Sequence, residues 1–126
     1  MAIAEDYNSE PLNIVLGNLE VRLAQNSFEI DAAQALRYKV FFEEMRANPS
    51  SEQKKSKRDI DEFDHYFDHI LVIDHYKTGK IYDKVVGTYR LNGGNYKDKK
   101  SFFYTSGEYD LSKLISLDGN ILELGR

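Results

Sequence analysis

The 126-residue sequence has no cysteine and no tryptophan, and its two prolines are Pro11 and Pro49. Without cysteine the chain cannot form a disulfide framework, a thiolate metal site or a cysteine nucleophile. No apolar run approaches the ~20 residues that a membrane-spanning helix needs. Glu5 and Asp6 stand where a secretory signal would carry positive charge, so we expect no signal peptide and favour a cytoplasmic location.

Basic residues are fewer than acidic residues, with 17 lysines and arginines against 21 aspartates and glutamates, which gives a net charge of −4. This balance argues against a general nucleic-acid-binding protein. Hydrophobic residues make up 41% of the chain and charged residues 30%, which is ordinary for a globular protein. The sequence contains no internal repeat, and its Asn-Gly-Gly-Asn segment at 92–95 lacks the features of a phosphate-binding loop.

The hydrophobic periodicity predicts one α+β domain with a mixed, mostly antiparallel sheet and an amphipathic helix after the first strand. Residues 1–15 are expected to form a flexible arm, and residues 16–126 the domain. Asn26 and Glu29 form a capping pattern ahead of the helix, which should end near Arg46 because Asn48 precedes a proline. Residues 48–58 lack core-forming side chains and are expected to be a mobile loop. The predicted strands are residues 19–23, 69–74, 84–91 and 121–126.

Five carboxylates crowd into residues 59–68: Asp59, Asp61, Glu62, Asp64 and Asp68. Clustered negative charge stabilises an ammonium group, so an amine or cation site is one interpretation. A solvated acidic turn is a second. A metal site is a third, because His65 and His69 are four residues apart. His69 opens a predicted strand that would point the two rings apart, so we expect no metal.

Arg37 stands on the otherwise apolar face of the predicted helix. A buried guanidinium is costly unless a carboxylate meets it, and the acidic stretch offers Asp59, Asp61 or Asp64. Alternatively, the stem of Arg37 packs at the helix edge while its charged end stays in water. The pattern leaves both interpretations open.

Two positions in the predicted strands also carry competing interpretations. Gly87 marks either a bulge or the close approach of another backbone or a ligand, or else a simple packing gap. Glu123 alternates with apolar neighbours, so it is either a solvent-facing strand residue or a general base whose pKa is raised by burial.

Several segments together resemble the N-terminal half of the ornithine-lipid N-acyltransferases. These enzymes have the GNAT fold and are similar to the acyl-homoserine-lactone synthases. The resemblance runs from Leu19 to Arg126 and rests on five segments in the correct order: LEVRLAQNSFEIDAAQALRYKVFFEEM, RDIDEFDHYFDHILVID, VVGTYRL, FFYTSGEYDL and LELGR.

The resemblance implies an enzyme that moves a 3-hydroxyacyl group from acyl carrier protein, or from an acyl-CoA thioester, to the α-amine of ornithine. The product is lyso-ornithine lipid, and no bound cofactor is expected. It implies a cytoplasmic enzyme that contacts the inner-membrane face. Acyl carrier protein is acidic, so the basic runs 54–58 and 97–100 are candidate docking surfaces, with solvated loops as the alternative.

The resemblance also implies a set of substrate-binding residues. The related signal synthases have an Arg and a Phe on a helix, which Arg37 and Phe41 match. They also have an acidic run, matched by Asp59, Asp61 and Asp64, and an Arg-Leu pair on a strand, matched by Arg90. Asp61 and Asp64 become candidates to bind an ammonium group. Glu123 would be the general base, directly or through water, and Arg126 would lie near the start of the loop that binds the pantetheine phosphate.

The sequence departs from GNAT enzymes in one respect. In those enzymes the strand that corresponds to residues 121–126 is followed by a phosphate-binding loop and helix, which the given sequence does not contain. We therefore expect the chain to be the N-terminal half of a larger domain and to be inactive alone. One alternative is an acyl-homoserine-lactone-type signal synthase that uses S-adenosylmethionine, but those enzymes usually have tryptophan in this region and the sequence has none. The other alternative is a non-catalytic binding or scaffold fragment. An exposed terminal strand would favour pairing with a second copy or with a missing C-terminal half.

Overall fold

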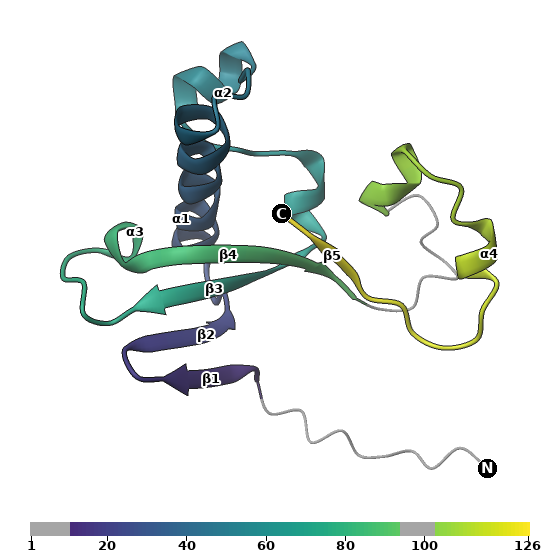
Figure 1. Cartoon of the computed structure of the whole chain (residues 1–126), viewed down its shortest axis with the longest axis horizontal. Coiled ribbons are helices and arrows are strands. Elements are labelled where there is room, and N and C mark those ends of the chain that lie inside the picture. The colour runs from purple at the N-terminus through teal and green to yellow at the C-terminus, as the bar shows by residue number, and fades with distance from the viewer. Residues whose placement is uncertain (1–10, 94–102) are drawn as a thin grey trace.

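A computed structural model describes residues 11–93 and 103–126, and these form one five-stranded sheet (Figure 1). Every described strand pair is antiparallel, and the strands follow one another across the sheet in sequence order. The strands are β1 (Asn13–Leu16), β2 (Leu19–Leu23), β3 (Asp68–Asp74), β4 (Val85–Asn92) and β5 (Glu123–Gly125).

The first strand begins earlier in the chain than the sequence predicted. Residues 13–15 belong to β1, which pairs with β2 through a tight turn at Gly17 and Asn18, so the predicted arm boundary at residue 15 is wrong. Gly17 has a φ of 60°, which a glycine adopts freely and which suits a two-residue hairpin turn. As a result, the amphipathic helix follows the second strand rather than the first. Residues 1–10 of the predicted arm lie outside the described residues.

The predicted helix is present as α1 (Ser27–Tyr38). The side chain of Asn26 accepts a hydrogen bond from the Glu29 backbone N–H at 3.0 Å, which confirms the predicted cap. The Glu29 carboxylate bonds instead to Arg22 and to the Gln25 backbone N–H. The helix continues as the π-helical segment η1 (Lys39–Glu44), so its end agrees with the prediction.

The mobile loop predicted for residues 48–58 is wrong, because the structure has the helix α2 (Ser51–Ser56) there. Ser50 and Gln53 form a reciprocal capping box, in which each side chain bonds to the other residue's backbone N–H. This polar helix buries none of its residues, so it has no hydrophobic periodicity to reveal it.

One face of the sheet packs on α1 and forms the core. Ala32 and Ala33 of α1 meet Leu71, Ile73 and Val85, and all five are buried. The short helix α3 (Ile81–Lys84) completes this layer. Small alanines let the helix approach the sheet closely.

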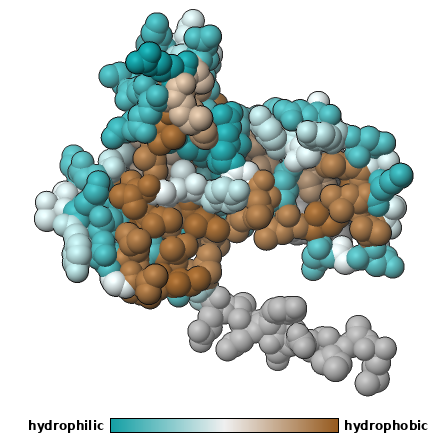
Figure 2. Space-filling model, viewed as in Figure 1, coloured by the Kyte–Doolittle hydropathy of each residue, from teal (hydrophilic) through white to brown (hydrophobic). Residues whose placement is uncertain are grey.

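The opposite face of the sheet is apolar too. The strand register gathers on it Ile14, Leu16, Leu19, Val21, Ile70, Val72, Tyr89 and Leu124. Leu16 is 78% exposed and Leu124 is 58% exposed. Figure 2 shows this surface as a hydrophobic patch over the strands. Within residues 11–93 and 103–126, no helix packs on this face.

Gly87 lies beside a register shift between β3 and β4, where Val72 pairs with Gly87 and Ile73 pairs with Val85. A Cβ atom at position 87 would lie 3.1 Å from Val72 Cγ2. The predicted bulge is therefore confirmed. The group that lies close to Gly87 is the Val72 side chain, not the backbone or ligand that the close-approach interpretation named.

The connection between β4 and β5 carries two short helices, η5 (Tyr104–Gly107) and α4 (Ser112–Ile115), which lie away from α1 (Figure 1). The Asp110 side chain accepts a hydrogen bond from the Ser112 backbone N–H at 3.0 Å, just ahead of α4. Among the described helices, none is long and apolar enough to cross a membrane.

Candidate functional site

Arg37 of α1 lies at the centre of a buried cluster of arginine and aspartate side chains. Its Nε donates to Asp59 Oδ2 at 3.2 Å, and its Nη2 donates to Asp64 Oδ1 at 2.9 Å and to the Asp59 carbonyl at 2.6 Å. Arg37 is 3% exposed. The structure therefore confirms the pairing of Arg37 with the acidic stretch and excludes the solvated alternative.

Arg90 of β4 is the second cation of this cluster, and it is also buried. Its Nη1 donates to Asp61 Oδ1 at 2.6 Å and to Asp64 Oδ1 at 3.0 Å, while its guanidinium lies 5.2 Å from the Phe67 ring centroid. Asp64 thus bridges the two arginines. We call these five residues the Arg–Asp cluster: Arg37, Asp59, Asp61, Asp64 and Arg90.

The local sequence explains how the carboxylates come together. Asp61 is the N-cap of the short 3₁₀ helix η2 (Glu62–His65), and its Oδ1 accepts from the Phe63 backbone N–H at 3.0 Å. Asp64 bonds back to the Asp61 backbone N–H, completing a capping box. The acidic stretch is therefore not a solvated turn as a whole, although Glu62 and Asp68 are exposed.

Both oxygens of Asp64 are occupied by donors inside the cluster. Burial by itself would raise the pKa of Asp64, but the charges of Arg37 and Arg90 and a hydrogen bond from Gln34 outweigh it, so the pKa lies below its ordinary value. The carboxylate is ionised at neutral pH. Three carboxylates then face two guanidinium groups, which leaves one negative charge in excess.

That excess charge is accessible at one member of the cluster. The Asp61 side chain is 27% exposed, against 4% for Asp59 and 4% for Asp64. Of the two residues predicted to bind an ammonium group, Asp61 therefore offers a carboxylate that an incoming molecule reaches, whereas Asp64 is enclosed.

His69 of β3 lies beside the cluster, with its Nε2 3.2 Å from the Asp64 carbonyl oxygen. Burial lowers the pKa of His69, so the ring is neutral at physiological pH. His65 is exposed on η2, whereas His69 is buried on β3. Within the described ranges, 11–93 and 103–126, no three histidine or acidic side chains are arranged so that together they could hold a metal ion.

Phe41 and Arg126, also predicted as site residues, lie together at a different place. The Arg126 guanidinium lies 5.0 Å from the centroid of the Phe41 ring. Both residues line a groove of about 270 Å³ between the helix and β4, and Arg37 lines it as well. The predicted residues therefore form two neighbouring groups, the Arg–Asp cluster and this groove, with Arg37 at their junction.

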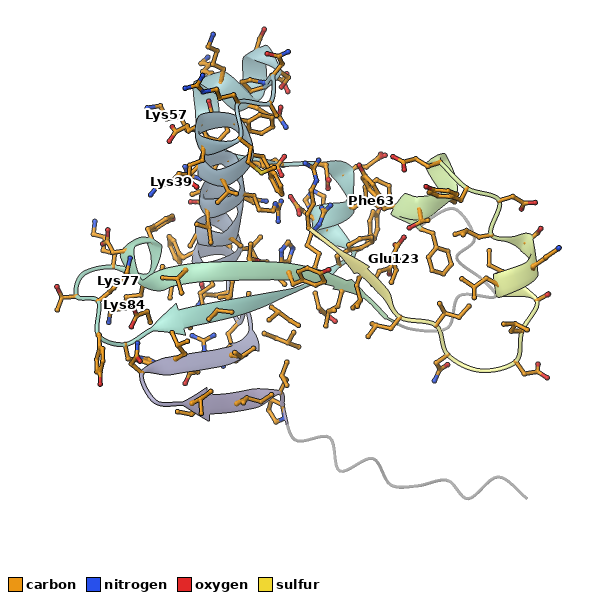
Figure 3. The ribbon with its side chains drawn as sticks, in the orientation of Figure 1. Lys39, Lys57, Phe63, Lys77, Lys84 and Glu123 are labelled. Carbon is orange, nitrogen blue, oxygen red and sulfur yellow. The ribbon has the colours of Figure 1, made fainter. Side chains whose placement is uncertain are left out.

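Glu123 lies on β5, and its carboxylate is held by several donors. Oε2 accepts from the Thr105 backbone N–H at 2.9 Å and from the Thr105 hydroxyl at 2.6 Å, and Oε1 accepts from the Tyr104 backbone N–H at 3.1 Å. Burial would raise the pKa of Glu123, but these bonds and one from Asn92 lower it below its ordinary value. The carboxylate anchors η5 to the sheet (Figure 3). This arrangement weighs against the base role, which stays a prediction.

Sequence reasoning missed two glutamines that support the cluster. Gln34 Nε2 donates to Asp64 Oδ2 at 3.0 Å, and Gln53 Nε2 donates to Asp59 Oδ1 at 3.2 Å. Gln34 stands three residues before Arg37 on the same helix, and residues at that spacing share a face. That spacing is the signal that would have found it.

Of the basic run at residues 54–58, three lysines are exposed: Lys54, Lys55 and Lys57. Arg58 is engaged elsewhere, because it pairs with Asp31 at 2.8 Å. The second predicted basic run, residues 97–100, lies outside the described residues.

Comparison with known proteins identifies relatives along nearly the whole chain. L-ornithine N(alpha)-acyltransferase of Rhizobium meliloti is 44% identical over 92% of the chain and 41% of its own length. The protein of the same name from Agrobacterium fabrum is 43% identical over 88% of the chain and 39% of its own length. The one from Rhodobacter capsulatus is 39% identical over 85% of the chain and 41% of its own length. The chain thus spans about two fifths of the length of these curated relatives. No solved structure matches it significantly.

The sequence profile described as "Acetyltransferase (GNAT) domain" matches residues 36–126. This stretch contains the whole Arg–Asp cluster, both groove residues Phe41 and Arg126, and strands β3 to β5. The predicted α+β class and GNAT fold are thereby confirmed. Because the match covers well over half of the chain, the protein belongs to the GNAT acetyltransferase family.

Proposed function

We propose that the protein acts in ornithine-lipid biosynthesis as an N-acyltransferase. It would transfer a 3-hydroxyacyl group from acyl carrier protein to the α-amine of ornithine and form lyso-ornithine lipid. The observation that carries this proposal is the 39–44% identity to proteins named L-ornithine N(alpha)-acyltransferase along most of the chain. Because the chain spans about two fifths of their length, the proposal assigns it the part of the protein that holds the Arg–Asp cluster.

The chemistry of the reaction defines what the cluster would do. The attacking amine must be neutral to add to the thioester carbonyl, after which the thiolate leaves and the amine proton is lost. Ornithine also has a δ-amine, which stays protonated. A carboxylate favours the protonated form of a nearby amine, so the accessible Asp61 suits the δ-ammonium rather than the reacting α-amine. In this proposal Asp61 orients ornithine, and the buried residues hold Asp61 in place.

GNAT enzymes take their acyl group from a thioester, and we propose acyl carrier protein as its carrier here. The exposed lysines of α2 and its C-terminal end, Lys54, Lys55 and Lys57, present positive charge to an acidic partner. Lys57 and Lys39 lie on the same side of the molecule (Figure 3). Arg126, beside Phe41, would face the phosphate of the carrier's arm. Action in the cytoplasm at the inner-membrane face belongs to the same proposal.

A chimera tests the activity. Residues 1–126 replace the matched region of the Rhizobium meliloti relative, and the product is incubated with ornithine and 3-hydroxyacyl carrier protein. Mass spectrometry is expected to detect acyl-ornithine. A chimera that is folded by circular dichroism but makes none, beside an active unaltered relative, would contradict the proposal.

The role of Asp61 is tested in the same chimera. Asp61→Asn keeps a residue that caps helices well and removes the charge, so the KM for ornithine is expected to rise about tenfold or more while the KM for the acyl donor changes little. Glu62→Gln is the matched control, because it removes a neighbouring exposed carboxylate outside the cluster. Equal ornithine KM values in the two variants would rule out the role.

A further inference from the structure

Arg90 holds the Arg–Asp cluster through only one of its guanidinium nitrogens. Its hydrogen bonds to Asp61 and to Asp64 both leave from Nη1. The side chain is 2% exposed, and across residues 11–93 and 103–126 its Nε has no hydrogen-bond partner. Buried donors are almost always paired in folded proteins. An acceptor is therefore missing on the side of the guanidinium that faces away from Nη1.

A cavity of about 210 Å³ lies beside Arg90. Its walls include Phe67, whose ring the guanidinium of Arg90 overlies, Tyr104 and Thr105 of η5, and Glu123 of β5. Cavities that hold drug-sized ligands measure roughly 300–1,000 Å³. This one therefore suits a small polar fragment of a ligand rather than a whole lipid chain or nucleotide.

Aromatic rings line one side of this cavity and strengthen any charge contact within it. The ring of Phe63 lies 5.5 Å from that of Phe67 and 5.3 Å from that of Tyr104, measured between centroids. Phe63 and Glu123 thus both contact Tyr104 (Figure 3). Charges attract more strongly beside apolar groups than in open water, so an anion next to Arg90 would be held more firmly than at an exposed arginine.

The hydrogen bonds of the two charged side chains Arg90 and Glu123 indicate what the cavity binds. Glu123 Oε1 accepts from the Tyr104 backbone N–H and from Asn92, and Oε2 accepts from the backbone N–H and the hydroxyl of Thr105. A carboxylate has about four lone-pair positions, so those of Glu123 are occupied. Arg90 instead has a donor to spare. The fitting ligand group is an anionic acceptor, and a carboxylate matches the planar guanidinium.

Asp61 fixes the other end of such a ligand. Its Oδ1 accepts from Arg90 Nη1 at 2.6 Å, and its side chain is 27% exposed. A carboxylate at the free edge of Arg90 and an ammonium group at Asp61 would then lie at different edges of one guanidinium. The ammonium group would balance the excess negative charge of the Arg–Asp cluster, so the incoming carboxylate would not be left uncompensated.

We propose that the cavity beside Arg90 binds the α-carboxylate of the acceptor amino acid, while Asp61 holds its side-chain ammonium group. The ligand class is an α-amino acid with a second amine at the end of its side chain. This subsite rests on the proposed function, because that function makes the acceptor a free amino acid bound at the Arg–Asp cluster. It adds a requirement for a free carboxylate, which a simple diamine does not meet.

The test uses the isotope-labelled 126-residue chain and follows the Nε–H signal of Arg90 by NMR. Three ligands are titrated: L-ornithine, L-ornithinamide, whose carboxylate is replaced by a neutral amide, and putrescine, which lacks the carboxylate. L-Ornithine is expected to move the Arg90 signal and to bind at least tenfold more tightly than either analogue, because they lose a charge-assisted hydrogen bond. The Nε–H signal of Arg58, which is bonded to Asp31, is the internal control and should stay in place.

Arg90→Lys is the matched variant. Lysine keeps a positive charge beside Asp61 and Asp64 but lacks the planar guanidinium edge. The preference for L-ornithine over L-ornithinamide should fall from tenfold or more to less than threefold, which a purely structural role of Arg90 would not cause. Arg58→Lys is the control and should retain the full preference. If Arg90→Lys does not fold, the three ligands still decide the question on the parent chain.

Equal affinity for L-ornithine and L-ornithinamide, or an Arg90 signal that L-ornithine does not move, would overturn the subsite. Inorganic phosphate tests a second source of anion. If phosphate moves the Arg90 signal and competes with L-ornithine at lower concentration, the cavity belongs to the phosphate of the acyl donor, and the subsite is likewise overturned.

These binding measurements fail separately from the activity of the chimera. An active chimera whose Arg90 signal does not respond to L-ornithine would overturn the carboxylate subsite alone. Binding of L-ornithine with the expected preference, beside a folded but inactive chimera, would support the subsite and overturn the acyl-transfer function alone.

Discussion

Two kinds of arginine–carboxylate contact occur in this small domain, and they differ in burial rather than in geometry. On the surface, Arg58 pairs with Asp31 at 2.8 Å, close to the 2.9 Å that separates Arg37 from Asp64. The side chains of Arg58 and Asp31 are 27% and 35% exposed, whereas those of Arg37 and Asp64 are 3% and 4% exposed. Distance alone would rank the two pairs as equals.

The difference lies in what happens when one partner is removed. Water solvates Asp31 when Arg58 is lost, so the surface pair contributes little. Asp59 and Asp64 have no such access, and the loss of Arg37 leaves buried carboxylates without their main counter-charge. We therefore expect loss of a partner from the buried cluster to destabilise the domain far more than loss of a partner from the surface pair.

The largest expected effect is that of Arg37→Ala. Breaking a buried ion pair typically costs about 3–5 kcal/mol, so urea unfolding should show a loss of this order or no cooperative transition at all. Lys39→Ala is the matched control, because it removes an exposed cation from the same helix at little cost. A loss below about 0.5 kcal/mol for Arg37→Ala would show that the buried cluster contributes no more to stability than a surface ion pair does.

Lowering the pH is expected to have an intermediate effect on the free energy of unfolding. The pKa of Asp64 is lower in the folded protein than in the unfolded chain, where it is about 3.9. Its contribution is fully present above pH 3.9 and is lost as the pH falls from there through the folded-state pKa. The free energy of unfolding, measured from pH 5 to pH 3, should therefore fall less steeply in Asp64→Asn than in the parent chain.

Asp31→Asn provides the comparison for that acid dependence. Asp31 also has a lowered pKa, mainly through its hydrogen bond from Arg58, but its side chain is 35% exposed. Asp31→Asn should therefore change the pH dependence of the unfolding free energy less than Asp64→Asn does. A larger change of slope in Asp31→Asn than in Asp64→Asn would reverse the ranking of the two regions.

The smallest effect is expected from Arg58→Ala. Exposed ion pairs contribute about 0.2–1 kcal/mol, and salt screens them, so the difference from the parent chain should shrink between low and high ionic strength. Thermal unfolding at the two salt concentrations measures this. A loss comparable to that of Arg37→Ala would show that the two contacts do not differ as their burial indicates.

Sequence reasoning gave the pairing of Arg37 with the acidic stretch as one of two interpretations, and Arg90 joined the set only through the family resemblance. Arg37 interrupts an apolar stripe, and the nearby acids offered the counter-charge that its burial requires. Strand β1 and helix α2 left no comparable mark, because their residues are mostly exposed and their formation rests on a turn at Gly17 and a capping box at Ser50. Such local bonds do not appear as periodicity.

The interpretation of Glu123 shows a different limit. Alternation located it correctly on a strand beside apolar neighbours, but the groups that reach its carboxylate come from Tyr104 and Thr105, nearly twenty residues earlier in the chain. A residue's chemistry depends on those distant contacts. These contacts hold the Glu123 carboxylate and lower its pKa, which weighs against the predicted base role without testing it.

The capping box of η2 makes the turn and the ion pairs inseparable. Asp61 Oδ1 accepts both from the Phe63 backbone N–H and from Arg90, and Asp64 Oδ2 accepts both from the Asp61 backbone N–H and from Arg37. The turn therefore cannot fray without also releasing a strand and a helix from their shared carboxylates. We therefore expect local opening of residues 59–64 to cost nearly as much free energy as global unfolding. Their amide hydrogens should exchange, and proteases should cleave there, mainly when the whole domain unfolds.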